Sequence, residues 1–238
     1  GQIVDKKLES QEGDKPSLEE INIELKDISY SVKGRNKPIL KDVNLKINHG
    51  ETVLIKGHSG SGKTSLLKTI AGIIEPTKGA IYINETSLKS IQLNYYRGFV
   101  GQTLAEDTPF EGTILDNITF GDPTISNEDI QWAIDATGLR SFVKEQSKGL
   151  KTILYPEGKQ ISFSVAKKIV LARSIVNKPK LLILREPLEH VQKDEALEII
   201  KMLTHKDKPW TLVVVSQNTD WEKNCSKVFQ IKEGSLKI

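Results

Sequence analysis

The sequence predicts an α/β fold in which a phosphate-binding loop joins a buried strand to a helix. Residues 57–64 read Gly-His-Ser-Gly-Ser-Gly-Lys-Thr, which matches the pattern G-x-x-x-x-G-K-[ST]. Residues 51–55, before the loop, have the pattern of a short buried strand, and residues 65–70 after it have that of the start of an amphipathic helix. Strand, glycine-rich loop and helix in this order are the context that the motif requires.

The loop predicts a site for nucleotide phosphates. Glycines let consecutive backbone N–H groups point inward, and the helix that follows begins with unpaired N–H groups and the positive end of its dipole. Lys63 is expected to reach the β- and γ-phosphates of ATP, and the Thr64 hydroxyl to bind Mg²⁺. The His58 side chain is expected to be exposed and incidental. The predicted nucleotide-binding residues of the loop are Gly57, His58, Ser59, Gly60, Ser61, Gly62, Lys63, Thr64 and Ser65.

Composition excludes several classes of protein. The 238 residues carry 34 basic and 31 acidic side chains, and a net charge of +3 is too mild to imply nucleic acid as the main partner. Cys225 is the only cysteine, which excludes a disulfide framework or a cysteine zinc site within one chain. No apolar run has the length that spans a bilayer. The chain starts with Gly1, and we expect it to be a piece of something longer.

Hydrophobic patterns predict the other elements. Residues 1–19 are charged and polar and are expected to form a linker. The apolar run 181–184 suits a parallel strand buried on both faces. Further strands are predicted at residues 21–30, 40–47, 80–83 and 211–215 and in a hairpin at 228–238, and helices at 126–137, 165–176 and 193–203.

Over about residues 21–238 the chain resembles the nucleotide-binding domain of an exporter-type ABC transporter. Besides the phosphate-binding loop, the matching stretches are residues 39–43, 50–51, 75–79, 99–102, 110–118, 172–175 and 181–187. The resemblance implies a P-loop NTPase fold with an ABC-type, RecA-like parallel core, an antiparallel β subdomain and a helical subdomain at about 104–164. It also implies that residues 20–238 form the domain and that 1–19 link it to a preceding transmembrane domain.

The strand at 181–184 leads into Arg185-Glu186, where the family has Asp-Glu. Glu186 matches the family's general base for the attacking water, and a carboxylate there can accept a proton or orient water. The alternative is a solvated acid at a strand end. Two opposite charges about 5 Å apart attract each other by roughly 3 kcal/mol. In the family the Asp holds Mg²⁺, so replacing it by a cation weakens the free energy of metal binding by up to about twice that amount. Two alternatives remain for Arg185: it pairs with Glu186, or it reaches a phosphate directly and changes the metal dependence.

Gln102 falls where the family has a glutamine that contributes to Mg²⁺ and water coordination, so the expected metal ligands are Thr64 and Gln102. The alternative for Gln102 is a polar strand end. Gln217, after Ser216, aligns with the family's switch histidine; glutamine can hydrogen-bond a phosphate but cannot shuttle a proton. The expected catalytic residues are thus Glu186, Gln102 and Gln217.

The family's signature loop, Leu-Ser-Gly-Gly-Gln, aligns with residues 161–165. In the family this loop lies at a helix start and contacts the γ-phosphate bound by the opposite subunit. Phe163 adds bulk where a glycine permits close approach, and Val165 lacks a side-chain amide. Only Ser162 remains as a possible phosphate contact.

Two further positions depart from the family. Residues 189–192 lack the aspartate expected in the D-loop. The aromatic residue that stacks on adenine aligns with Val32, which we retain as an adenine contact. Tyr30 either substitutes for that aromatic residue or packs on the sheet.

The resemblance implies an ATP-binding domain that couples nucleotide binding, with weak hydrolysis, to export across a membrane. A fully active transport ATPase domain is the alternative, favoured by the intact loop, Gln102 and Glu186. A soluble member acting in translation or DNA maintenance is a third hypothesis. The implied partners are a transmembrane domain of the same or a neighbouring chain and a second nucleotide-binding domain, in a homo- or heterodimer at the cytoplasmic face of the inner membrane, without nucleic acid.

Overall fold

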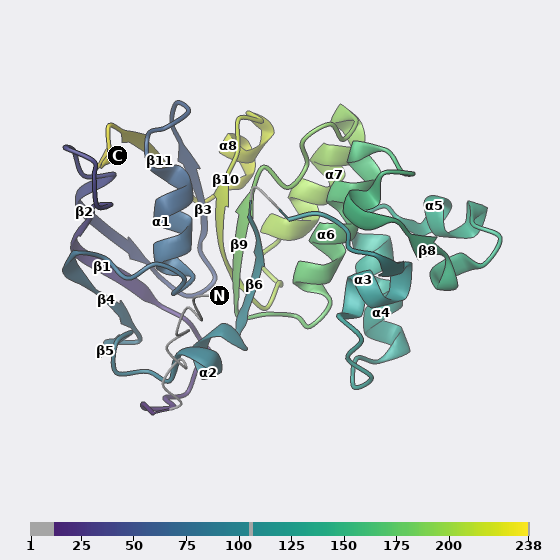
Figure 1. Cartoon of the computed structure of the whole chain (residues 1–238), viewed down its shortest axis with the longest axis horizontal. Coiled ribbons are helices and arrows are strands. Elements are labelled where there is room, and N and C mark those ends of the chain that lie inside the picture. The colour runs from purple at the N-terminus through teal and green to yellow at the C-terminus, as the bar shows by residue number, and fades with distance from the viewer. Residues whose placement is uncertain (1–11, 105–106, 238) are drawn as a thin grey trace, which may run out of the picture.

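The computed structural model describes residues 12–104 and 107–237. The strands form a four-stranded antiparallel sheet, a six-stranded sheet that is parallel except for β12, and a small two-stranded pair (Figure 1). In sheet order, the first contains β2 (Leu40–Ile47), β1 (Ile23–Tyr30), β4 (Lys78–Ile83) and β5 (Thr86–Ser87); the second contains β12 (Ser235–Lys237), β11 (Lys227–Lys232), β3 (Thr52–Lys56), β10 (Thr211–Val215), β9 (Leu181–Arg185) and β6 (Val100–Thr103); the pair is β7 (Gly112–Thr113) and β8 (Ile153–Leu154). The predicted combination of a parallel core with an antiparallel sheet is confirmed.

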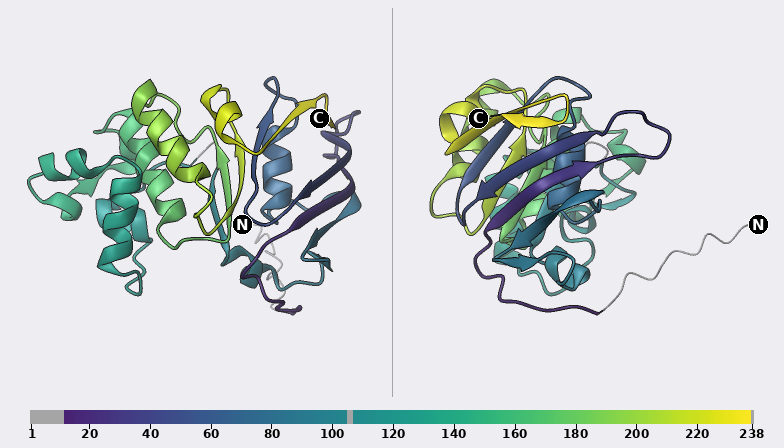
Figure 2. Two further views of the ribbon diagram at one scale, coloured as in Figure 1. Left: turned by 180° about the vertical axis from the view of Figure 1, so that it is seen from behind. Right: turned by 90° about the vertical axis from the view of Figure 1, so that its left-hand side faces the viewer.

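Helices separate into two groups. Helix α1 lies between the two large sheets, and a helical end of the molecule lies beyond β6 and β9 (Figures 1 and 2). No helix in the described ranges has the length and apolarity needed to cross a membrane. The helices are α1 (Lys63–Ile70), α2 (Leu93–Arg97), α3 (Ile114–Thr119), α4 (Asn127–Ala136), α5 (Arg140–Glu145), α6 (Phe163–Ile175), α7 (Lys193–Thr204) and α8 (Asp220–Asn224), with 3₁₀ turns at Gly149–Lys151 and Pro156–Gly158.

The first antiparallel strand keeps its apolar side chains on one face through a bulge. Ile23 and Leu25 alternate, but the next buried residue, Ile28, is three positions further along the chain. The pairing of β1 with β2 shifts register between Leu25 and Ile28, and Asp27 within the shift has φ 51°. The bulge places an extra residue in β1 between Leu25 and Ile28. The side chain of Ile28 therefore points to the same face as that of Leu25, although the two are an odd number of positions apart. The predicted strand at residues 21–30 is thus observed as β1, with its buried side chains on one face.

The central strands are buried on both faces. Alternate residues of β9 enter two different hydrophobic cores, Leu181 and Ile183 on the side of α1, and Leu182 and Leu184 on the side of α6 and α7. All four are fully buried. A strand between two helical layers has no polar face, which explains the continuous apolar run.

The helical end begins and ends with the local signals that the sequence carries. Ser126 caps α4, because its Oγ accepts a hydrogen bond from the backbone N–H of Asp129 at 3.1 Å. Gly138, with φ 68°, follows the helix as the predicted stop. Helix α6 starts at Phe163, two residues before the predicted start, because Ser162 provides its N-cap.

Several elements were not predicted, and tertiary contacts hold them. The five-residue helix α2 is too short to have a periodic pattern of its own. The hydroxyl of Tyr96 in α2 is buried and donates to the backbone carbonyl of Ile70 at 2.8 Å. Within the predicted linker, residues 12–19 lie against the domain at Leu18, which is buried.

The Tyr96 hydroxyl gives a test of this packing. Tyr96→Phe should lower the free energy of unfolding by about 1 kcal/mol, because the Ile70 carbonyl loses its donor, and the melting temperature should fall by about 3 °C. Tyr82→Phe is the control, since Tyr82 is partly exposed on β4. Equal melting temperatures for the two variants would contradict the assigned role of the hydrogen bond.

Candidate functional site

The phosphate-binding loop runs from the end of β3 to the start of α1. Gly62 is the N-cap of α1 with φ 106°, and a Cβ there would lie 2.8 Å from the carbonyl oxygen of Ile39. Gly60 has φ 76° and no atom within 4 Å of the position of a Cβ. Gly62 is therefore required by packing as well as by its backbone angle, whereas Gly60 leaves the loop open on one side.

The loop presents unused hydrogen-bond donors. In residues 12–104 and 107–237, no acceptor is found for the backbone N–H groups of Gly60, Gly62, Lys63, Thr64 and Ser65. The Oγ of Ser61 is buried and also has no hydrogen-bond partner. An unpartnered buried hydroxyl costs about 1–3 kcal/mol, so the loop is built for an acceptor that a phosphate would provide.

Lys63 is held over the loop. Its Nζ donates to the carbonyl oxygens of Gly57 and His58, each at 2.6 Å, and only 9% of the residue is exposed. Burial lowers the pKa of the ammonium group, and the nearby charge of Arg185 lowers it further. The His58 side chain itself is exposed, as the sequence predicts.

Glu186 and Gln217 come to the same place from two neighbouring strands. Glu186 follows β9 with φ 42°, and its carboxylate accepts hydrogen bonds from the Ser216 hydroxyl and the Gln217 backbone N–H, both at 2.9 Å. Burial raises the pKa of this carboxyl group, partly offset by the two hydrogen bonds. The Gln217 side chain then donates from Nε2 to the Gly57 carbonyl oxygen at 3.1 Å. The structure thus joins the loop, the carboxylate and the glutamine at one edge of the sheet.

Ser216 and the Gly57 carbonyl are parts of this site that sequence reasoning missed. From the sequence, no role is expected for Ser216. A usable signal is that Ser216 is a hydroxyl residue directly after a buried strand, β10. This strand lies next to β9, which leads into Glu186.

Gln102 lies one strand further along the same sheet. It pairs in register with Ile183 of β9 and is exposed. Its neighbour Thr103 accepts a hydrogen bond on Oγ1 from the backbone N–H of Arg185, at 3.4 Å. The structure therefore places Gln102 on the strand next to β9 but gives its side chain no hydrogen bond within the described ranges.

The two other predicted contacts lie on other segments of the chain. Val32 lies in the turn between β1 and β2 and is 40% exposed. Tyr30 is partly buried and packs against the core beneath the first sheet, which supports the packing alternative for this residue. Ser162 caps α6, and no hydrogen bond, ion pair or ring contact in the described part of the chain connects it to the phosphate loop.

The residue after Ser162 is the most exposed large apolar side chain of the described chain. Phe163 is 76% exposed, and its ring centre lies 5.6 Å from that of His190. Segment 161–165, aligned with the signature loop, and segment 189–192, aligned with the D-loop, therefore meet on one surface.

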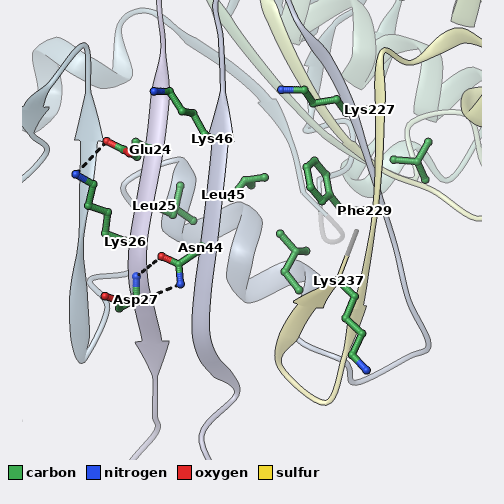
Figure 3. A pocket seen from close by; sticks show the side chains of 12 residues that line it. Glu24, Leu25, Lys26, Asp27, Asn44, Leu45, Lys46, Lys227, Phe229 and Lys237 are labelled. Atoms are coloured by element: carbon green, nitrogen blue, oxygen red, sulfur yellow. Dashed lines mark hydrogen bonds and ion pairs between the residues drawn. The ribbon is translucent and has the colours of Figure 1, made fainter.

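A separate groove lies away from these residues. A groove of about 770 Å³ separates β1 and β2 from the β11–β12 hairpin, and Figure 3 shows Lys46, Lys227 and Lys237 around an apolar floor that includes Phe229. None of its lining residues belongs to the phosphate loop, to Glu186 or to Gln217. Its lining residues are Glu24, Leu25, Lys26, Asp27, Asn44, Leu45, Lys46, Lys227, Val228, Phe229, Leu236 and Lys237.

Comparisons with known proteins agree with this geometry. ATP-binding cassette sub-family B member 5 of Homo sapiens is 28% identical over 240 residues, which cover 99% of this chain and 19% of that protein. ABC transporter B family member 29, chloroplastic, of Arabidopsis thaliana is 31% identical over 90% of this chain and 34% of that protein. The alpha-hemolysin translocation ATP-binding protein HlyB of Escherichia coli is 29% identical over 99% of this chain and 34% of that protein.

The chain thus spans about a third or less of the length of these relatives. The solved structure of a bacterial Atm1-family ABC exporter with ATP bound matches with a TM-score of 0.85 at 18% identity, over 92% of this chain and 38% of that one, and this likeness shows the fold. The sequence model of the family described as ABC transporter matches residues 40–189, more than half of the chain. The chain therefore belongs to the ABC transporter family.

Proposed function

We propose that this chain binds ATP through residues 57–65 and serves as the nucleotide-binding domain of an exporter. The observation that carries the proposal is the set of unpaired backbone N–H groups at the start of α1, together with the buried, unpartnered Oγ of Ser61. A triphosphate supplies the acceptors that these donors lack. Lys63, held above them by two carbonyl oxygens, adds a positive charge.

Domains of this family generally use ATP with Mg²⁺, which supplies positive charge to the phosphates. Here the chain offers the metal the hydroxyl of Thr64 and the side-chain amide of Gln102. Both ligands are neutral. Val32, on the exposed turn after β1, is the residue proposed to contact adenine.

We favour weak hydrolysis over full ATPase activity. Glu186 is the proposed base, and its carboxylate is held in place by Ser216 and Gln217. Two residues argue against rapid turnover. Arg185 places a positive charge where the family holds the metal, and Gln217 stands where the family has a histidine. The fully active ATPase remains the alternative, supported by Glu186 and the intact loop. The translocation ATP-binding protein HlyB among the relatives does not favour a soluble, non-transport role.

The proposed partners follow from the relatives and from the position of Ser162. The chain corresponds to part of longer relatives, so a transmembrane domain on the same or a neighbouring chain is proposed as one partner, at the cytoplasmic face of the inner membrane. No hydrogen bond, ion pair or ring contact in the described ranges joins Ser162 to its own phosphate loop, so the phosphate proposed for it belongs to a second nucleotide-binding domain, identical or different. Nucleic acid is not proposed as a partner.

Lys63 provides the first test. Lys63→Ala should weaken binding of a non-hydrolysable ATP analogue at least about ten-fold, because a charge-assisted contact to phosphate is lost. Isothermal titration calorimetry measures the change. Lys68→Ala is the matched control, since Lys68 lies in the last turn of the same helix and should leave binding unchanged. Unaltered binding by the Lys63 variant would contradict the proposed site.

Phosphate release tests the proposed weak hydrolysis. With Mg²⁺ and ATP, the chain should turn over well below about 1 s⁻¹, at the low end of enzymatic rates. Glu186→Gln should reduce the remaining rate about ten-fold or more, because the amide cannot accept the proton of water. Glu157→Gln, which makes the same change at an exposed carboxylate of the helical end, is the control. A wild-type rate near 1 s⁻¹ or above would favour the active alternative.

A further inference from the structure

Arg185 places a positive charge beside the phosphate loop. It is the last residue of β9 and pairs with Val215 of β10, which pairs in turn with Ile55 of β3, two residues before Gly57. Parallel strands bring their carboxyl ends to one edge of a sheet, where ligands of α/β folds bind. The charge of Arg185 lowers the pKa of the Lys63 ammonium group, so the guanidinium group belongs to the electrostatic surroundings of the loop.

The guanidinium group of Arg185 has no anionic partner among the described residues. Its Nε is buried without a hydrogen-bond acceptor, and no carboxylate of residues 12–104 or 107–237 forms an ion pair with it. The adjacent carboxylate of Glu186 instead accepts its hydrogen bonds from Ser216 and Gln217. Of the two alternatives that the sequence left, pairing with Glu186 is therefore not observed. A partly buried cation with an unsatisfied donor favours an incoming anion.

The same surroundings suit Mg²⁺ poorly. Mg²⁺ in nucleotide sites is bound through one or two carboxylates together with phosphate oxygens and water. The described part of the chain has no cluster of three or more acidic, histidine or cysteine side chains that could hold a metal ion. Thr64 and Gln102 are neutral, and Glu186 is already engaged by two donors. A divalent cation here would also meet the charges of Lys63 and Arg185.

We propose that Arg185 supplies to the phosphate tail the positive charge that Mg²⁺ supplies in other phosphate-loop sites, so that this chain binds metal-free ATP about as tightly as Mg²⁺-ATP. This inference rests on the proposed function and concerns the same loop. It makes Arg185 a specificity-determining residue, selecting nucleotide without the need for a metal ion. Arginine suits this role because its fork of N–H donors remains charged at all physiological pH values and matches phosphate oxygens.

Calorimetric titration of the whole chain with a non-hydrolysable ATP analogue tests the inference, once with excess Mg²⁺ and once with EDTA. For the wild type, the two dissociation constants should agree within about three-fold. Arg185→Asp should weaken binding in EDTA by about 100-fold, because a favourable contact is replaced by repulsion. In excess Mg²⁺ the same variant should bind the analogue at least about ten-fold more tightly than it does in EDTA. Arg185→Lys keeps the charge and should retain tight binding in EDTA.

Two further variants separate the local effect from other causes. Lys148→Asp makes the same change of net charge at an exposed residue of the helical end and should leave both dissociation constants unchanged. Arg185→Met removes the charge at similar length and should lose about ten-fold in EDTA; its melting curve and that of Arg185→Asp establish that the variants are folded.

The outcomes are distinct. Wild-type protein that binds the Mg²⁺ complex ten-fold or more tightly than the free analogue overturns the inference and leaves ATP binding standing. Folded Arg185→Met that binds in EDTA as tightly as wild type also overturns it. Wild-type protein that binds neither form overturns the proposed function itself.

Discussion

The carbonyl oxygen of Gly57 is the junction on which the arrangement of the site depends. It accepts a hydrogen bond from Nζ of Lys63 at 2.6 Å and another from Nε2 of Gln217 at 3.1 Å. The first bond closes the phosphate loop onto the start of α1, and the second attaches the segment after β10. Gly57 also packs so closely on β11 that a Cβ would lie 2.4 Å from the carbonyl oxygen of Ile231. One peptide group thus fixes the loop against a helix and two strands.

The sequence predicts an element well where one physical pattern determines it. Alternation gave β2 its bounds, and a continuous apolar run gave β9, because burial on one face or on two leaves a direct mark on residue type. It failed for α2, β5, β6 and α8, which have between two and five residues. Elements this short have no period to detect, and contacts such as the hydrogen bond from Tyr96 to Ile70 hold them in place.

The candidate site divides in the same way. The phosphate loop is contiguous in sequence, so its residue types alone indicate where donors will gather. The contact between Ser216 and Glu186 depends on the register of β10 against β9, in which Val215 is opposite Arg185. That register is set by the packing of two whole strands and leaves no local mark. The resemblance to a family identified Glu186 and Gln217 as important, but only the structure shows that they contact each other.

Residues 161–165 contain no glycine, and this affects the outer surface rather than the backbone. Ser162 adopts φ −68° and ψ 154°, which any residue can adopt, and it caps α6 as serine often does. Phe163 begins the helix with ordinary backbone geometry, so its side chain causes no backbone strain. What changes is the outer surface, where an aromatic ring that is 76% exposed stands beside His190. A second domain approaching this helix start would meet a bulky apolar side chain instead of bare backbone, so it needs a complementary hollow for Phe163 if its phosphate is to reach the Ser162 hydroxyl.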